Sequence, residues 1–300
     1  MKKVLILLGA AVSLLVLSTL ASAQIPIPWM PEGVKPLVYG FENPPVIDGV
    51  LDEWAEIPED YYFTTEQFTP RPAGKKVEID LTDLAVTVWN AWCPGVGVDG
   101  AGAFFFACQW YDNMCRGAEI AADPEFAWDQ TDIWELEVDA DGSGGQVYVS
   151  EGDAAYVRRH KNAQAQQYGI NGIPGNIWYH HKGWPVKPPF TEVASTFEGT
   201  QDGEGTMSME VRITPFNDLS IDEELYELQT LEPGWTCRLQ HEMLDTDEEV
   251  YHMYLVLNGA DGSYLTSDKW IEFELDEVTP GSGPTAVQQT TWGQMKAQFK

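Results

Sequence analysis

Residues 44–54 read PPVIDGVLDEW, and this stretch indicates the fold more clearly than any other part of the chain. Val46-Ile47 favours a short strand, and Asp48-Gly49 favours a tight turn because glycine tolerates a positive φ. Asp52 is placed to cap a helical turn that buries Leu51 and Trp54. We therefore expect these residues to have a structural rather than a catalytic role.

The first 23 residues have the pattern of a secretory signal peptide. Two lysines are followed by an apolar run over residues 4–20, and Ala21-Ser22-Ala23 fits the small-residue cleavage rule. Cleavage leaves a mature chain that begins at Gln24, with a proline-containing linker over residues 24–36. The sequence therefore predicts a secreted, periplasmic or cell-surface protein that is not inserted in the membrane after cleavage.

The chain is strongly acidic. Its 300 residues include 47 Asp and Glu against 17 Lys and Arg, and the mature chain loses two lysines more, which gives a formal charge of −32. Such a surface repels phosphate backbones and anionic lipid headgroups, so nucleic acid and the bilayer are not expected partners. About 277 residues remain, enough for one large domain or two small ones.

Strand-like segments separated by Gly, Pro, Asn and Asp follow one another without an alternation of strands and helices. In residues 207–213, for example, every second side chain is apolar, which is typical of a strand with one face in a core. The order favours an all-β, antiparallel, jelly-roll-like β-sandwich, with the polar, helix-like residues 152–168 as a short helical surface insertion. The predicted strands are residues 83–92, 103–111, 133–139, 146–150, 206–213, 235–243, 253–257 and 270–275.

Five motifs, in this order, resemble the family 9 carbohydrate-binding modules and the wider DOMON-like sandwich superfamily. They cover residues 37–276, the expected domain, and the resemblance implies a β-sandwich that binds polysaccharide or oligosaccharide without hydrolysing it. It also implies calcium in structural positions. The motifs are IDGVLDEW at 47–54, WYDN at 110–113, DIWELEVD at 132–139 (similar to the family's DsvEvfvD), MEVRITPF at 209–216 (similar to EvaIPf, with Thr214 inserted) and DTD at 245–247 (the family's D.D).

Four cysteines are candidates for disulfides: Cys93, Cys108, Cys115 and Cys237. An exported chain is expected to oxidise at least some of them. Four cysteines allow three pairings, and the sequence does not choose among them. Neither a CxxCH haem-attachment motif nor a CxxC zinc pattern is present, which favours structural thiols or disulfides.

The loop DADGSGGQ at residues 139–146 is the candidate metal site. Asp139 and Asp141 stand at alternate positions among glycines, an arrangement that suits oxygen ligation of Ca²⁺. A β-hairpin whose turn uses the same Asp and Gly residues explains the loop without an ion. The sequence leaves both interpretations open, with any ion in a structural role.

The segment NGIPGNIWYHHKGWPVKPPF at 171–190 is the candidate carbohydrate site. Aromatic rings on a Gly- and Pro-rich loop suit stacking on the apolar face of a pyranose, which nominates Trp178, Tyr179 and Trp184. The alternative is that these rings close one end of the sandwich and are buried. Trp128, just before the 132–139 motif, is a further candidate for either role.

Catalysis has little support in the sequence. Neither GxSxG nor HExxH is present, and with 47 acidic residues some carboxylates fall near each other by chance. His180 and His181 are adjacent, so in an extended chain they point to opposite sides and are not expected to share an ion. We therefore expect a non-enzymatic module.

Three function classes follow. The first is an exported carbohydrate-binding module for neutral glycans. The second is a haem-binding DOMON-like electron-transfer domain with Met207, Met209, Met243 or a histidine as axial ligand, although methionines on strands usually pack in the core. The third is a structural cell-envelope or filament subunit, for which residues 277–300, a linker and short amphipathic tail, offer a docking segment for a cell-surface or protein partner.

Overall fold

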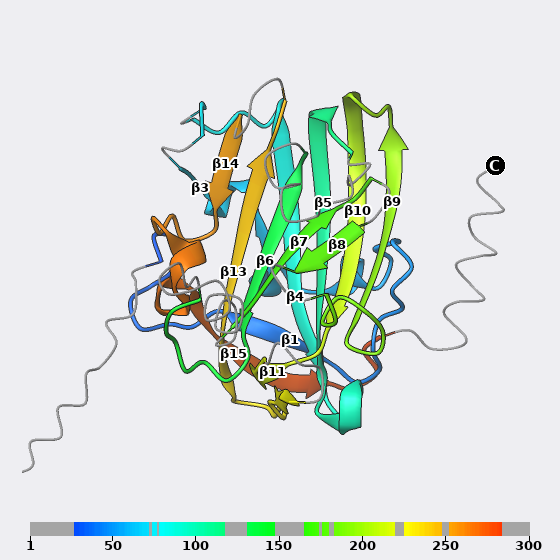
Figure 1. Cartoon of the computed structure of the whole chain (residues 1–300), viewed down its shortest axis with the longest axis vertical. Coiled ribbons are helices and arrows are strands. Elements are labelled where there is room, and N and C mark those ends of the chain that lie inside the picture. The colour runs from blue at the N-terminus through cyan, green and yellow to red at the C-terminus, as the bar shows by residue number, and fades with distance from the viewer. Residues whose placement is uncertain are drawn as a thin grey trace, which may run out of the picture.

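The computed structural model describes residues 27–71, 74–76, 78–117, 131–147, 165–173, 176–179, 183–219, 225–247 and 252–283. Most strands belong to one hydrogen-bonded path, in the order β8-β7-β6-β13-β15-β1-β4-β5-β10-β9. The path folds over on itself, so that β6, β7 and β8 lie in front of β5 and β10 (Figure 1). The predicted all-β sandwich is confirmed.

We call β8, β7, β6, β13 and β15 the front layer, and β4, β5, β10 and β9 the back layer. β1 joins them and runs parallel to both neighbours, β15 and β4, whereas the other pairs along the path are antiparallel. The sheet is therefore mixed rather than purely antiparallel. The strands are β1 Leu37–Phe41, β2 Tyr62–Thr64, β3 Thr69–Pro70, β4 Leu84–Cys93, β5 Ala103–Cys115, β6 Ile133–Asp139, β7 Gln166–Asn171, β8 Asn176–Tyr179, β9 Thr191–Gly199, β10 Gly203–Ile213, β11 Phe216–Asp218, β12 Glu227–Leu228, β13 Thr236–Asp245, β14 Met253–Val256 and β15 Ile271–Thr279.

Helical structure in the described residues is limited to single 3₁₀ turns. They are η1 Trp54–Glu56, η2 Glu59–Tyr61, η3 Thr65–Gln67, η4 Val98–Gly100, η7 Ser263–Leu265 and η8 Ser267–Lys269. Within this described part, no helix is long and apolar enough to cross a membrane. The expected helical insertion at residues 152–168 ends in the strand β7, and residues 148–164 lie outside the described residues.

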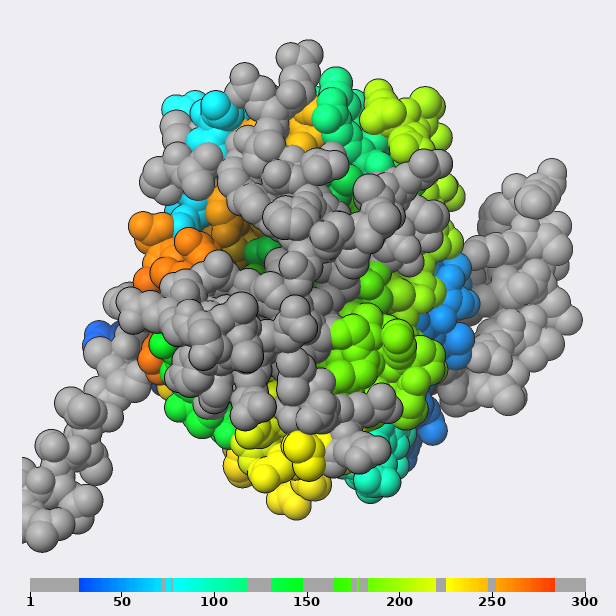
Figure 2. Space-filling view, viewed as in Figure 1, coloured from blue at the N-terminus to red at the C-terminus, as the bar shows by residue number. Residues whose placement is uncertain are grey.

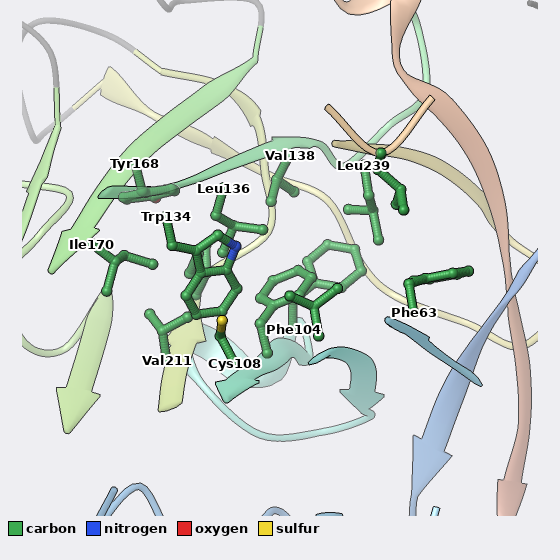
Figure 3. Close-up of a cluster of buried hydrophobic side chains, with 14 of the residues drawn as sticks. Phe63, Phe104, Cys108, Trp134, Leu136, Val138, Tyr168, Ile170, Val211 and Leu239 are labelled. Atoms are coloured by element: carbon green, nitrogen blue, oxygen red, sulfur yellow. The ribbon is translucent and has the colours of Figure 1, made fainter. Parts of the chain in front are cut away.

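The main core lies between the two layers. Trp134, Leu136 and Val138 project from β6 toward Phe104 and Phe106 of β5, as Figure 3 shows for most of this cluster. Alternation along β6 thus places every second side chain in the core and the intervening acidic ones on the outer face. This periodicity is why the predicted bounds of β6, residues 133–139, agree with the structure.

His241 connects the layers inside this core. Its ring stacks on Trp134, and its Nδ1 accepts a hydrogen bond of 3.0 Å from the Trp134 indole N–H. Because an indole N–H only donates, the proton of the neutral imidazole sits on Nε2, which lies 2.8 Å from Oδ1 of Asn90 on β4. Burial lowers the pKa of His241 to about 3, so the ring is neutral in the native state.

The opening motif, residues 44–54, packs on the outer face of the back layer. Trp54 is fully buried beside Phe41, and its indole N–H donates to Oε1 of Glu210 at 2.8 Å. The other oxygen of Glu210 accepts from the backbone N–H groups of Asp48 and Gly49 at 3.0 and 2.6 Å. One buried carboxylate on β10 thus holds both ends of the turn.

The local structure of this motif differs from the expectation in two details. Val46 and Ile47 form no strand, because their backbone is not paired with another strand. The 3₁₀ turn at Trp54 has Glu53 at its N-terminal cap position, without a side-chain cap hydrogen bond, so Asp52 does not cap it. Gly49, at φ 82°, lies so close to the Ser195 backbone that a Cβ atom would be 2.5 Å from its carbonyl carbon.

The domain extends beyond both predicted boundaries. On the N-terminal side, Trp29 packs on Phe63 and donates to the Leu257 carbonyl at 3.3 Å, so part of the expected linker belongs to the fold. On the C-terminal side, β15 continues to Thr279, and Ser282 binds the backbone N–H of Glu42 through its hydroxyl at 2.8 Å. The signal peptide and the tail from residue 284 lie outside the described residues and remain predictions.

Candidate functional site

The outer face of the front layer carries a row of acidic and amide side chains. β6 contributes Glu135 and Glu137, and β13 contributes Glu242 and Gln240 directly opposite them. We call this set, with Gln167 of β7 opposite Glu137, the carboxylate face. Its members are buried, with 7% of Glu135 and 5% of Gln167 exposed and the other three at 0%.

Glu242 is held by hydroxyl groups. Tyr254 of β14 and Ser263 of η7 each donate to one of its carboxylate oxygens. Glu242 also shares a side-chain hydrogen bond with Glu135, and burial raises its pKa. At least part of this pair is therefore protonated and able to donate as well as accept.

Glu137 is the exception in the face, because neither of its carboxylate oxygens has a hydrogen-bond partner. Burial, and then the charges of Glu242 and Glu135, raise the pKa of Glu137 well above its ordinary value. A fully buried carboxyl group without a partner is uncommon in native proteins and destabilises the fold until a donor arrives. Glu137 is thus prepared to accept hydrogen bonds.

The register continues this row across the sheet. Glu242 of β13 is opposite Glu135 of β6, which is opposite Gly169 of β7, which in turn is opposite Trp178 of β8. Gly169 presents no side chain between its two neighbours. The backbone position of Trp178 therefore lies in the same row as the carboxylate face, although its side chain lies outside the described part of the structure.

A second acidic group lies where three strands end. Asp112 near the end of β5, Asp132 just before β6 and Asp245 at the end of β13 place carboxylate oxygens within 4.8 Å of one another, and all three are buried. We call these three residues the aspartate cluster. Asp132 accepts from the backbone N–H groups of Arg116 and Thr246 at 2.5 and 3.0 Å, whereas both oxygens of Asp245 have no partner.

Burial and mutual repulsion act together in this cluster. They raise the pKa of Asp245 to about 9 and that of Asp132 well above its ordinary value, with Asp112 shifted in the same direction. Three buried carboxyl groups at this spacing either retain protons or share a cation. The arrangement suits a hard divalent ion with oxygen ligands.

The predicted metal loop is occupied by its own turn. Oδ2 of Asp139 accepts from the Gly144 N–H at 2.9 Å, and Oδ1 of Asp141 accepts from the Ser143 N–H at 3.1 Å. Gly142 adopts φ 65°, as the turn requires. These hydrogen bonds close a local turn, but the loop is not a β-hairpin, because β6 pairs with β7 and β13 while Gln146 bridges Thr266. Oδ1 of Asp139 has no hydrogen-bond partner, and a cation at Asp139 and Asp141 remains a prediction.

The aromatic candidates separate in the structure. Trp184 is half-buried, and its ring centroid lies 5.0 Å from Phe190, 5.3 Å from Phe216 and 5.7 Å from Tyr226. It packs in this aromatic cluster and keeps part of its surface exposed, so a stacking role for Trp184 stays a prediction. Trp178 and Tyr179 lie on β8, with side chains outside the described residues, and Trp128 and His180-His181 lie outside them altogether.

All four cysteines are buried free thiols, contrary to the expectation of at least one disulfide. Cys93 packs in the cluster on the outer face of the back layer, whereas the other three face the core between the layers. Cys108 and Cys115 lie seven positions apart on one strand, β5, which separates their sulfur atoms. Burial raises the pKa of Cys93 to about 11 and, with nearby Asp112 and Asp132, that of Cys115 to about 12.

The residues named for haem ligation lie inside the core. Met207, Met209 and Met243 are at most 1% exposed, and both ring nitrogens of His241 are engaged by Trp134 and Asn90. The methionines therefore have the packing role that is usual on strands.

Comparison with known proteins identifies the fold. No family model and no curated protein matches the chain. Among solved structures, two of a family 9 carbohydrate-binding module from Caldicellulosiruptor kristjanssonii, in complex with cellotriose and with glucose, match with a TM-score of 0.50 each. They are 11% and 12% identical to this chain, and the match covers 83% of this chain and 98% and 100% of theirs. The chain thus has a fold like that of family 9 modules, as the sequence motifs implied.

Proposed function

We propose that the chain is an exported, non-catalytic carbohydrate-binding module whose ligand lies along the carboxylate face. The observation that carries the proposal is Glu137, a buried carboxyl group with two unpartnered oxygens in a row of hydrogen-bonding side chains. Sugar hydroxyl groups are suitable donors, and Glu135 and Gln167, the two members of the face that keep some exposed surface (7% and 5%), offer further partners. The likeness in fold to modules solved with cellotriose and glucose supports the same ligand class.

We assign the aromatic part of the proposed site to Trp178. Its backbone occupies the next position of the row beyond Gly169, which presents no side chain between Trp178 and the carboxyl groups. Stacking on an exposed ring contributes on the order of 1 kcal/mol. The proposal therefore retains Trp178 and assigns Trp184 to packing.

The spacing of the carboxyl groups favours binding over hydrolysis. Glu135 and Glu242 share a hydrogen bond. Glycosidase pairs are separated by roughly 5 Å or more so that the sugar fits between them. We therefore expect no release of product from any bound glycan.

Binding is tested by calorimetric titration with cello-, xylo- and chito-oligosaccharides and by pull-down on cellulose, xylan and chitin. The strongly negative chain is expected to prefer such neutral glycans to acidic ones. Glu135→Gln, which replaces the carboxyl group by an amide, is expected to weaken binding about 10- to 100-fold, and Trp178→Ala about 5- to 10-fold.

Two controls accompany this experiment. Glu198→Gln changes an exposed glutamate on β9 of the back layer and should bind as the unmodified protein does. Trp184→Ala should lower the melting temperature because it removes a packed ring. A panel without any binding, or full affinity in both Glu135→Gln and Trp178→Ala, would exclude the carboxylate face as the ligand site.

We also propose that Ca²⁺ binds the aspartate cluster as a structural ion. Two unpartnered oxygens of Asp245 face two further buried carboxylates, and an ion there would join the ends of β5, β6 and β13 across the two layers. Oxygen ligands from carboxylates are what Ca²⁺ takes in proteins. This site replaces Asp139 and Asp141 as the preferred location.

Chelation distinguishes the two locations. Removing Ca²⁺ is expected to lower the melting temperature, because an ion bound only by the native state stabilises it, by about 2.7 kcal/mol at a hundredfold excess over Kd. Asp112→Asn should abolish the response to calcium, and Asp141→Ala should leave it intact. If Asp141→Ala abolished the response and Asp112→Asn left it intact, Ca²⁺ would bind the 139–146 loop instead. An unchanged melting temperature in excess chelator would contradict both locations.

A further inference from the structure

A pocket of about 510 Å³ opens at the strand ends beside the aspartate cluster. Its lining includes Asp83, Asp247, His252 and Lys76, with Asn113 at one side. In Figure 2 the segment around residues 70–80, in cyan, lies at the surface beside the orange segment that includes β14, in agreement with the bridge between Lys76 and Met253. Two of the lining side chains, Lys76 and His252, are partly exposed, at 35% and 25%.

Four side chains converge in this pocket. Asp83, Asp245, Asp247 and His252 each place one oxygen or nitrogen so that these atoms lie within 4.8 Å of one another. Nε2 of His252 lies 3.2 Å from Oδ2 of Asp247 and 3.5 Å from Oδ2 of Asp83. Asp245 also belongs to the aspartate cluster, so the two sets share one carboxylate.

The ion pairs of His252 with Asp247 and Asp83, and of Lys76 with Asp83, leave several atoms of the group without a hydrogen bond. Nε2 of His252, Oδ1 of Asp247 and both oxygens of Asp245 have no hydrogen-bond partner. Asp245 is fully buried, with its carboxylate in the group. Unpaired donor and acceptor atoms that approach this closely are the arrangement expected when they all face a common cation.

A hydrogen bond from a neighbouring side chain fixes the orientation of Asp83. Asn113 donates through its side-chain nitrogen to Oδ1 of Asp83 at 2.6 Å, which leaves Oδ2 toward His252. Outer hydrogen bonds of this kind fix the ligating oxygen of a metal-binding carboxylate. The carboxylate is thus held in one orientation before any ion arrives.

We propose that Asp83, Asp245, Asp247 and His252 bind a divalent transition-metal ion, with Zn²⁺ as the probe, at a site separate from the proposed calcium ion and linked to it by the carboxylate of Asp245. The imidazole distinguishes this set from the all-oxygen aspartate cluster, since His suits Zn²⁺ and related ions and is not a usual ligand of Ca²⁺. The two oxygens of Asp245 allow one to face each ion. The inference does not depend on carbohydrate binding.

In the metal-free chain, Lys76 is paired with one of the oxygens proposed to bind the metal ion. Its Nζ lies 2.7 Å from Oδ2 of Asp83, the oxygen that faces His252. The Lys76 side chain is 35% exposed, so its ammonium group can move into solvent when a metal ion takes this oxygen. Lys76 is therefore a competitor for the site, and its removal should strengthen metal binding.

The test uses the full mature chain without a histidine tag, freed of metal by dialysis against a chelator. Zn²⁺ is titrated in calorimetry and in competition with a chromogenic chelator. We expect one ion per chain, a loss of affinity of about 30-fold or more in His252→Ala, and a gain of about 3- to 10-fold in Lys76→Met. His252 is partly exposed, so His252→Ala is expected to fold, which a far-UV spectrum and a melting curve check.

Three further variants locate the ion. Asp112→Asn should lose the calcium response and keep Zn²⁺ affinity, whereas Asp245→Asn should weaken both. The double variant His180→Ala, His181→Ala should bind Zn²⁺ as the unmodified chain does. Absence of stoichiometric binding, equal affinity in His252→Ala, or loss of binding in the His180 and His181 variant would overturn the proposal, and none of these results bears on the carboxylate face.

Discussion

Replacing Trp54 by Ala is expected to lower the free energy of unfolding by about 3–5 kcal/mol, the usual range for a fully buried aromatic ring. The change leaves a cavity against Phe41 and removes the indole N–H that Glu210 accepts. It also removes one of the donors that hold Glu210, the carboxylate that binds the backbone of Asp48 and Gly49. Chemical denaturation, followed by intrinsic fluorescence and circular dichroism, measures the difference.

Two variants separate packing from hydrogen bonding at this position. Trp54→Phe keeps most of the ring volume and removes only the N–H, so it should destabilise by about 1–2 kcal/mol. Trp235→Ala makes the same substitution at a ring that is 37% exposed and should have less than half the effect of Trp54→Ala. Equal losses at the two tryptophans would show that the opening motif does not anchor the back layer.

Acidification is expected to destabilise the fold through His241. The pKa of this histidine is lowered by burial from its ordinary value of 6.5 to about 3. The unfolded chain therefore binds a proton between these values that the native chain does not, so stability is complete above pH 6.5 and falls as the pH decreases toward 3. A shift of this size corresponds to a loss of roughly 5 kcal/mol.

His241→Gln isolates this contribution from the many carboxylates of the chain. The side chains around the ring are Trp134, Asn90 and Phe106, none of which is charged. Groups elsewhere titrate equally in both proteins, so the difference in unfolding free energy between the two should shrink steadily from pH 7 to pH 3. A difference that stays constant with pH would mean that the imidazole is charged or hydrated in the native state.

The strands that the sequence predicted well are those with one face in the core. In β6 and β10, apolar residues alternate with polar ones, and the predicted segments agree with the structure at residues 133–139 and within three residues at 206–213. β9 was missed because it is an edge strand paired only with β10, and most of its residues are half-buried or exposed. Edge strands of this kind have little hydrophobic pattern.

β7 was missed for a different reason. Its sequence, QQYGIN, presents Gln167 and Gly169 to the carboxylate face, so the strand lacks the apolar signal and was assigned to a polar helix. Every residue of β7 is nevertheless buried. A strand whose outer face is polar but buried therefore cannot be recognised from the alternation of apolar and polar residues in its sequence.

The sequence could not reveal the two candidate sites, because each brings together residues from strands that are far apart in the sequence. Glu135 and Glu137 alternate with apolar residues along one predicted strand, but their pairing with Glu242 and Gln240 depends on the contact between β6 and β13. The aspartate cluster combines one residue from each of three sequence motifs that had been interpreted only as signs of the family fold. One carboxylate in each of three motifs, at the ends of predicted strands, is the signal that would have indicated the cluster.

The parallel strand β1 has a consequence for the order in which the chain folds. This strand is formed by residues 37–41, yet one of its partners is β15, and the backbone just after it is bound by Ser282. The nascent chain must therefore keep its first strand unpaired on one side until almost the last residues of the domain have been synthesised. Contacts of such long sequence separation slow folding, because the loop between them is closed late. The layers can be joined only in a nearly complete polypeptide, so a chain that ends before β15 should remain open and accessible to proteases.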